Sequence, residues 1–106
     1  MSRNEVYAAL KSTGIPWAHV AWPYGQSPDL PFGLLIEEDP GFAADDSKYA
    51  RSARYTAELY TKFYNPALAK AVEDAIAPWG NCSKTEAWIA EENCCVTYFE
   101  FTEIGD

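Results

Sequence analysis

The stretch Tyr49-Ala50-Arg51-Ser52-Ala53-Arg54-Tyr55-Thr56-Ala57-Glu58-Leu59-Tyr60-Thr61 carries the clearest alternation of apolar and polar residues in the chain. Successive side chains of a β-strand point to opposite faces, so this period of two predicts a long strand with one buried face. We expect the buried face to hold Ala53, Tyr55, Ala57 and Leu59. We expect the other face to hold Arg54, Thr56, Glu58 and Tyr60.

A helix is predicted directly after this strand. Asn65 is suited to cap its first turn, and Pro66 is suited to the first helical position. One apolar stripe then follows at a spacing near four, and Gly80-Asn81 is expected to end the helix. The stripe consists of Leu68, Val72, Ile76 and Trp79.

The remaining elements are shorter. A first helix, capped by Asn4 and stopped by Gly14, is expected to carry an apolar face. Strands are expected at residues 17–22, 32–37, 86–90 and 95–102, with loops at 23–29 and 42–47 and a tight turn at Glu91-Glu92-Asn93.

These elements, in the order α-β-β-β-α-β-β, predict an α+β fold: a mainly antiparallel sheet of about five strands with two helices packed on one face. The last strand has apolar residues on both faces, which favours an interior position in the sheet. A chain of 106 residues with no interior linker is expected to form a single domain, 1–106.

Composition supports a packed core and restricts the partners. Hydrophobic residues make up 48% of the chain and aromatic residues 15%. The formal net charge of −8 disfavours nucleic-acid binding and docking on an anionic membrane. The amino-terminal residues are polar rather than those of a signal peptide, and the longest apolar runs are too short to cross a bilayer. Three cysteines, two of them adjacent, favour a reducing cytoplasm.

Catalytic and metal-binding residues are not predicted. His19 is the only histidine, and the chain has no local signature for a Cys-His pair. Cys82, Cys94 and Cys95 with His19 formally make a zinc ligand set, but adjacent strand residues point to opposite faces. We therefore expect no catalytic residues, no metal and no cofactor.

Acidic clusters are expected to be solvated ends of strands and loops. They lack the regular oxygen ligands and central glycine of a calcium loop. The clusters are Glu37-Glu38-Asp39, Asp45-Asp46 and Glu91-Glu92.

Charge is unevenly distributed along the sequence. Bases gather at Lys48, Arg51, Arg54 and Lys62, whereas from Glu86 onward the chain has six acids and no base. Such patches suit head-to-tail contact between subunits of a ring, or equally an intrachain match between neighbouring strands. On loop exposure and charge, the candidate interface residues are Asp45, Asp46, Lys48, Arg51 and Arg54.

Several short strings, in order, resemble the tail terminator (tail-completion) family of long-tailed bacteriophages, the siphophages and their prophage relatives. The resemblance runs from about Val6 to Phe101. No single string is specific, and the match rests on their order and spacing. The strings are Gly14-Ile15-Pro16, Pro31-Phe32, Phe42-Ala43-Ala44-Asp45, Glu58-Leu59-Tyr60-Thr61, Val72-Glu73, Ser83-Lys84-Thr85-Glu86-Ala87-Trp88-Ile89 and Tyr98-Phe99-Glu100-Phe101. Phe63-Tyr64 and the three cysteines depart from the family pattern.

This resemblance implies a virion structural protein. Such proteins cap the finished tail tube as a ring, expected to be a hexamer, and present a surface to the head connector proteins. The implied partners are further copies of the chain, the tail tube protein and the connector, with DNA passing through the lumen without specific binding. The implied location is the head-proximal end of the tail, after assembly in the cytoplasm of the bacterial host.

Three other functions remain open from the sequence. One is a head-side connector or adaptor protein of the phage neck. Another is an acidic inhibitor or immunity protein that mimics DNA against a nuclease, which would be a monomer with a focused acidic face. The third is a small thiol enzyme, which would lose activity on Cys82→Ser or Cys95→Ser.

Overall fold

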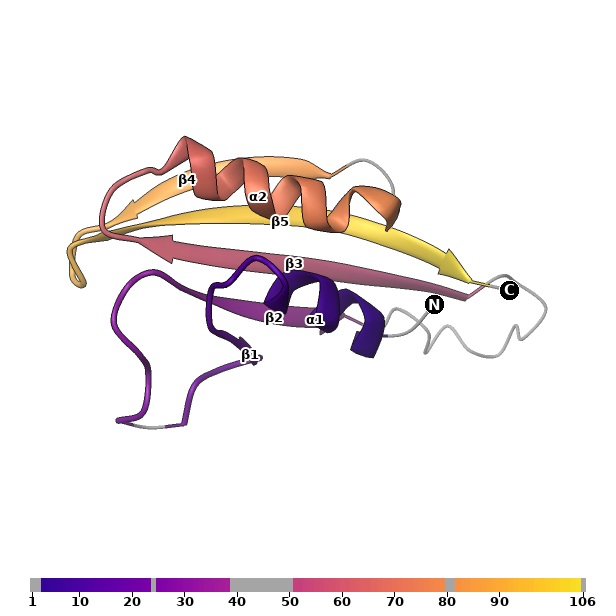
Figure 1. The fold of residues 1–106 in the computed structure, drawn as a ribbon, viewed down its shortest axis with the longest axis horizontal. Helices are drawn as coiled ribbons and strands as arrows, with labels where there is room; N and C mark the ends of the chain where they lie inside the picture. Colours follow the sequence, from indigo (N-terminus) through magenta and orange to yellow (C-terminus); the bar gives the residue numbers. More distant parts are fainter. Residues whose placement is uncertain (1–2, 24, 39–50, 80–81, 106) are drawn as a thin grey trace.

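The computed structural model describes residues 3–23, 25–38, 51–79 and 82–105. The elements follow in the order α1 (Arg3–Lys11), β1 (Trp17–His19), β2 (Phe32–Glu38), β3 (Arg51–Thr61), α2 (Pro66–Ile76), a 3₁₀ turn (Ala77–Trp79), β4 (Ser83–Ile89) and β5 (Cys94–Gly105). The strands form one sheet in the order β1-β2-β3-β5-β4, and α1 and α2 both lie on one of its faces (Figure 1). The predicted α+β fold and its order of elements are confirmed.

The sheet is antiparallel except at one edge. Strand β1 runs parallel to β2, whereas β2 with β3, β3 with β5, and β5 with β4 are antiparallel. Strand β5 therefore lies inside the sheet, as predicted from its two apolar faces. Long-range pairing of β3 with β5 forms the centre of the molecule.

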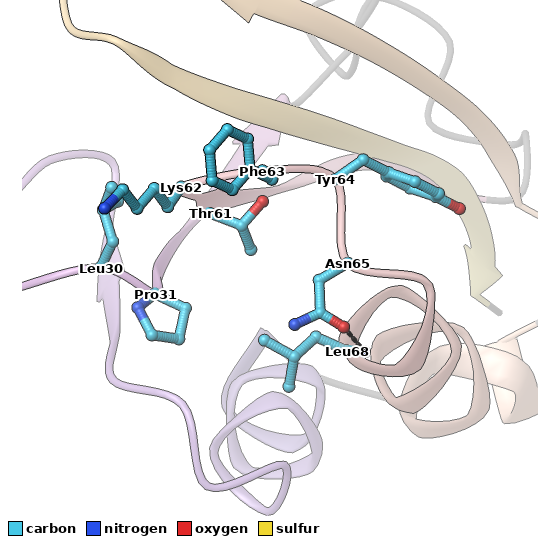
Figure 2. Close-up of a pocket in the computed structure, with 8 residues that line it drawn as sticks. All are labelled: Leu30, Pro31, Thr61, Lys62, Phe63, Tyr64, Asn65 and Leu68. Carbon is cyan, nitrogen blue, oxygen red and sulfur yellow. Dashed lines mark hydrogen bonds between the residues drawn. The ribbon is translucent and has the colours of Figure 1, made fainter.

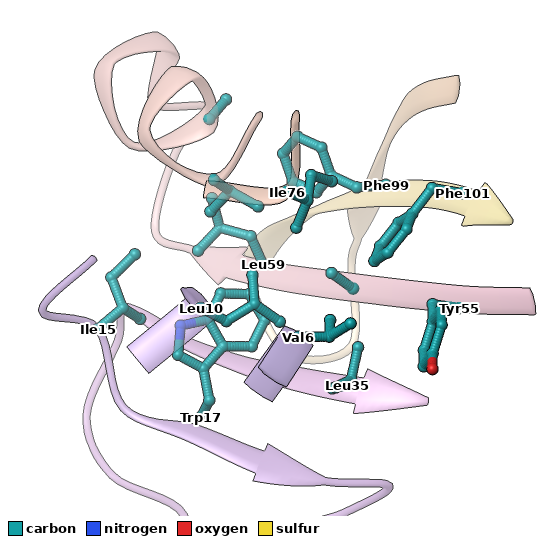
Figure 3. Packing of buried hydrophobic residues seen from close by; sticks show 13 residues of the cluster. Val6, Leu10, Ile15, Trp17, Leu35, Tyr55, Leu59, Ile76, Phe99 and Phe101 are labelled. Atoms are coloured by element: carbon teal, nitrogen blue, oxygen red, sulfur yellow. The ribbon is translucent and has the colours of Figure 1, made fainter. Parts of the chain in front are cut away.

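The face of the sheet under the helices holds the core (Figure 3). The predicted alternation in β3 is confirmed where side chains are described, because Tyr55, Ala57 and Leu59 are buried. In register, Ala57 lies between Leu35 of β2 and Phe99 of β5, so one apolar row crosses three strands. The helices close over these rows. The buried cluster comprises Val6, Leu10, Ile15, Trp17, Leu35, Tyr55, Ala57, Leu59, Ala69, Val72, Ile76, Phe99 and Phe101.

Helix α2 begins as predicted. The Asn65 side chain accepts a hydrogen bond from the Leu68 backbone nitrogen at 3.1 Å, and Pro66 opens the helix. Val72 and Ile76 are buried, while Leu68 and Trp79 are partly buried against the core. The expected end at Gly80-Asn81 lies outside the described residues.

Several predicted boundaries were wrong. Helix α1 begins at Arg3, so Asn4 lies inside it instead of capping it. Strand β1 stops at His19 rather than Trp22, because Val20 has a left-handed φ of 72° and the Ala21 backbone nitrogen bonds back to the His19 carbonyl at 2.8 Å. Strand β4 covers Ser83–Ile89 and β5 covers Cys94–Gly105, which are both longer than expected.

Candidate interaction surfaces

The sheet face turned away from α1 and α2 carries aromatic side chains. Phe32 and Tyr60 are paired in register on β2 and β3, and their rings stack with centroids 5.1 Å apart. Trp22 packs edge-on against Phe32 with centroids 6.2 Å apart. We call Trp22, Phe32 and Tyr60 the aromatic cluster. All three side chains are half-buried, so the cluster presents ring surface without being sealed in the core.

One row of mixed polar and apolar residues lies beside the aromatic cluster on the same face of the sheet. Leu34, Glu58 and Tyr98 are paired across β2, β3 and β5. Aliphatic and aromatic surface thus continues beside polar groups. Aromatic residues with a few polar groups are typical of the centre of a protein interface.

A hydrogen bond orients the edge of the aromatic cluster. The Tyr60 hydroxyl donates to Glu58 Oε1 at 2.7 Å. Partial burial raises the pKa of the Tyr60 phenol well above its ordinary value, and the hydrogen bond to the Glu58 carboxylate raises it further. The phenol therefore keeps its proton to a higher pH than an exposed tyrosine does.

A pocket of about 270 Å³ lies where β3 ends and α2 begins (Figure 2). Leu30, Pro31 and Leu68 supply apolar lining, and Asn65 joins them while its carbonyl oxygen caps α2. Thr61 also lines the pocket, but its hydroxyl oxygen is buried without a hydrogen-bond partner. This pocket offers shape and apolar surface rather than acid-base chemistry.

Two aromatic side chains stand at the rim of this pocket. Phe63 is 68% exposed and Tyr64 is 39% exposed, and Figure 2 shows them pointing in different directions. A single exposed ring is ordinary, but two adjacent rings beside an apolar pocket form a contiguous surface that a partner could cover. Both residues belong to the string that departs from the family pattern.

The histidine and the cysteines are not brought together. His19 is exposed on the edge strand β1, whereas Cys94 and Cys95 begin β5, with β2 and β3 in between. Three strand spacings separate β1 from β5, roughly 14 Å. Within the described ranges, no group of three or more His, Cys, Asp or Glu side chains is placed to hold a metal ion.

The thiols are poorly suited to be nucleophiles. Cys94 and Cys95 are buried, Cys82 is half-buried, and none is in a disulfide. Burial raises the pKa of Cys82 and of Cys94, and Glu73 and Glu92 respectively raise it further. A raised pKa keeps the sulfur protonated, and the thiolate is the reactive form.

The predicted interface residues lie mostly beyond what the structure describes. Asp45, Asp46 and Lys48 are outside the described residues. Arg51 begins β3 opposite Gly105. Arg54 is exposed in β3, in register between Glu38 on β2 and Thr102 on β5.

The strand register places two of the basic residues beside acidic positions of the same chain. The register sets Arg54 across from Glu38 of its own chain. Lys62 follows the end of β3 that pairs with the start of β5, so it shares this end of the sheet with the Glu91-Glu92 turn. This register leaves both interpretations of the charge pattern open, contact between subunits and a match within one chain.

Neither the aromatic cluster nor the pocket was predicted from the sequence. The aromatic cluster could have been suspected from Tyr60, an aromatic residue on the otherwise polar face of the alternating strand. The pocket could have been suspected from Phe63-Tyr64, two aromatic residues directly before a capped helix. Trp22 was expected at the end of a strand over 17–22, and Pro31 lay just before the next expected strand, so their positions beside β2 and β3 come from the tertiary fold.

Comparison of the chain with protein-family models and with curated proteins finds no match. Among the described helices, none has the length and apolar character needed to cross a membrane.

Proposed function

We propose that this chain is a tail terminator of a long-tailed bacteriophage, which caps the completed tail tube as a ring and joins it to the head connector. The main support for the proposal is the order of the short sequence strings that resemble the tail terminator family. These strings lie along a chain whose elements follow in the order α-β-β-β-α-β-β. Gly14-Ile15-Pro16 joins α1 to β1, and Pro31-Phe32 leads into β2. Glu58-Leu59-Tyr60-Thr61 ends β3, beside its partner β5.

Two surfaces support a role in assembly. The aromatic cluster and the rim residues Phe63 and Tyr64 present ring surface to solvent. Aromatic side chains dominate the energetics of protein contacts because each buries a large area at little cost in conformational entropy. We assign these surfaces to contacts with the tube protein or with further copies of the chain.

The inhibitor alternative gains no support from the placement of charge. A DNA mimic needs a focused acidic face. Acids of the described residues are instead distributed over both helices and four strands of the sheet. Examples are Glu5 on α1, Glu37 on β2, Glu58 on β3, Glu73 on α2, Glu86 on β4 and Glu100 on β5.

The deciding experiment deletes the gene from the phage or prophage that encodes this chain. Tail lengths in the lysate are measured by electron microscopy, with the wild-type gene supplied in trans as the control. Over-long tubes without heads support the terminator role. Normal tails that fail to join heads would place the protein in the connector, and an unchanged lysate would contradict a structural role in the virion.

A point variant ties the role to the surface. Phe63→Ser removes the most exposed ring at the pocket rim, and Lys70→Ser, at an exposed position of α2 outside the pocket lining, is the control. Supplied in trans to the deletion, Phe63→Ser is expected to restore tail length less well than Lys70→Ser. Equal restoration by both variants would remove Phe63 from the proposed contact.

A further inference from the structure

Strand β4 is the long open edge of the sheet. It pairs with β5 on one side, and the described part of the chain has no strand on its other side. All of its residues are exposed except Ile89, which is half-buried. The opposite edge, β1, is only three residues long and ends at the turn of Val20. An open edge presents unpaired N–H and C=O groups to any strand that fits it.

The protection of this edge against pairing lies in its two charged side chains, Lys84 and Glu86. The sequence Ser-Lys-Thr-Glu-Ala-Trp-Ile contains no proline and no glycine. Trp88 is 52% exposed. The charges of Lys84 and Glu86 are therefore the main feature that selects a partner.

The charges of β4 and their positions along the strand favour a second copy of β4 as the strand that pairs with this edge. Lys84, Glu86 and Trp88 pair with Phe99, Thr97 and Cys95 on the helix-bearing face of the sheet. In a continuous antiparallel sheet, paired residues share a face, so a twofold axis must pass through one residue pair. An axis at Thr85 sets Lys84 opposite Glu86 of the partner subunit, and the symmetry repeats this contact.

The neighbouring register is unfavourable. An axis at Glu86 would place two glutamates directly opposite each other, and like charges in that position are destabilising. An axis at Ala87 would set Glu86 opposite Trp88 of the partner subunit and leave Lys84 without an acidic partner across the axis. Only the Thr85 register matches opposite charges and sets threonine against threonine, which is a favourable cross-strand pair.

We propose that β4 pairs antiparallel with β4 of a second copy about a twofold axis at Thr85, joining two five-stranded sheets into one. Lys84, which already contacts Glu73 of its own chain at 3.5 Å, then lies between that carboxylate and Glu86 of the partner subunit. The dimer covers the open edge in the free protein and does not depend on the tail role. Because a twofold contact is isologous, a cyclic ring with one face toward the tube and the other toward the connector does not keep it, so this dimer belongs to the free protein.

The first test measures oligomeric state across a concentration series of the full chain, by light scattering after size exclusion. Glu86→Lys sets lysine opposite lysine twice, so the dimer dissociation constant is expected to rise about tenfold or more. The matched control is Glu91→Lys, which makes the same charge change in the β4–β5 turn, outside the paired residues. Lys84→Glu with Glu86→Lys restores opposite charges and is expected to recover the dimer, with circular dichroism checking the fold.

The second test uses disulfide cross-linking to locate the residue pair on the twofold axis. In a Cys82→Ser background, Thr85→Cys places two thiols opposite each other and is expected to form a disulfide-linked dimer under mild oxidation. Ala87→Cys lies on the same strand and face but opposite Ser83 of the partner subunit, so it should cross-link far less.

Three results would overturn the proposal. They are a wild-type chain that stays monomeric at every concentration, equal effects of Glu86→Lys and Glu91→Lys, and equal cross-linking by the two cysteine variants. None of these results bears on tail length, so the proposed function stands or falls separately.

Discussion

At the scale of single residues, Gly33 shows how a core position depends on a neighbour far along the chain. Gly33 and Trp17 are paired in register on β2 and β1, and the indole lies over the glycine. A Cβ added at Gly33 would come within 2.7 Å of the Trp17 Cδ2 atom, with other ring atoms nearer still. The missing side chain therefore makes room for the ring.

Gly33→Ala is expected to lower the free energy of unfolding by about 1–3 kcal/mol, because extra volume in a packed core forces strain. Urea denaturation measures the change. In a Trp17→Leu background, which removes the overlapping ring, the same substitution should cost much less. An equal cost in both backgrounds would show that the indole is not the cause.

Tyr60 supplies a pH-dependent prediction. Its folded pKa is raised above the ordinary 10.0 by burial and by Glu58, so the folded chain holds this proton more tightly than the unfolded chain. The resulting stability is fully present below pH 10 and is lost as the pH rises above it. Tyr60→Phe should therefore lose less stability between pH 9 and pH 11, measured by urea denaturation at each pH. A parallel decline in both proteins would contradict this assignment.

At the scale of elements, α2 depends on its first turn. The Asn65 side chain satisfies the Leu68 backbone nitrogen, one of the donors that a helix leaves unpaired at its start. Lys70 and Asp74 add an exposed ion pair at 3.3 Å, a contact of small energetic value. The cap is the larger of the two local contributions.

Asn65→Ala is expected to lower the free energy of unfolding by about 1 kcal/mol. Asn65→Asp keeps a side-chain oxygen at the cap and should stay close to the wild type. Chemical denaturation of the three proteins makes the comparison. If alanine and aspartate cost the same, the hydrogen bond to Leu68 does not stabilise the helix.

At the scale of the whole molecule, the excess of acid sets the response to salt. Sixteen acidic residues oppose eight basic ones, and this excess repels itself more in the compact state than in the extended chain. Raising sodium chloride from about 20 mM to about 200 mM shortens the range of that repulsion. The free energy of unfolding should rise, and a fall would mean that attractive pairs such as Lys84 with Glu73 dominate.

Periodicity and local chemistry by themselves determined the elements of this protein. Alternation in residues 49–61 predicted β3, and Asn65-Pro66 with an apolar stripe predicted α2, because both signals lie in neighbouring residues. The order of elements and the interior position of β5 followed from the same patterns. Several boundaries did not follow from these patterns, because the end of β1 depends on a backbone turn at Val20, a β-branched residue whose left-handed φ no propensity favours.

Only the tertiary structure decided which surfaces exist. The aromatic cluster joins residues from the loop before β2, from β2 and from β3, and the pocket joins Leu30 and Pro31 to the start of α2. The open edge at β4 follows from the strand order, which places β5 between β3 and β4. These features depend on contacts between distant segments, and a local pattern carries no information on which segments will meet.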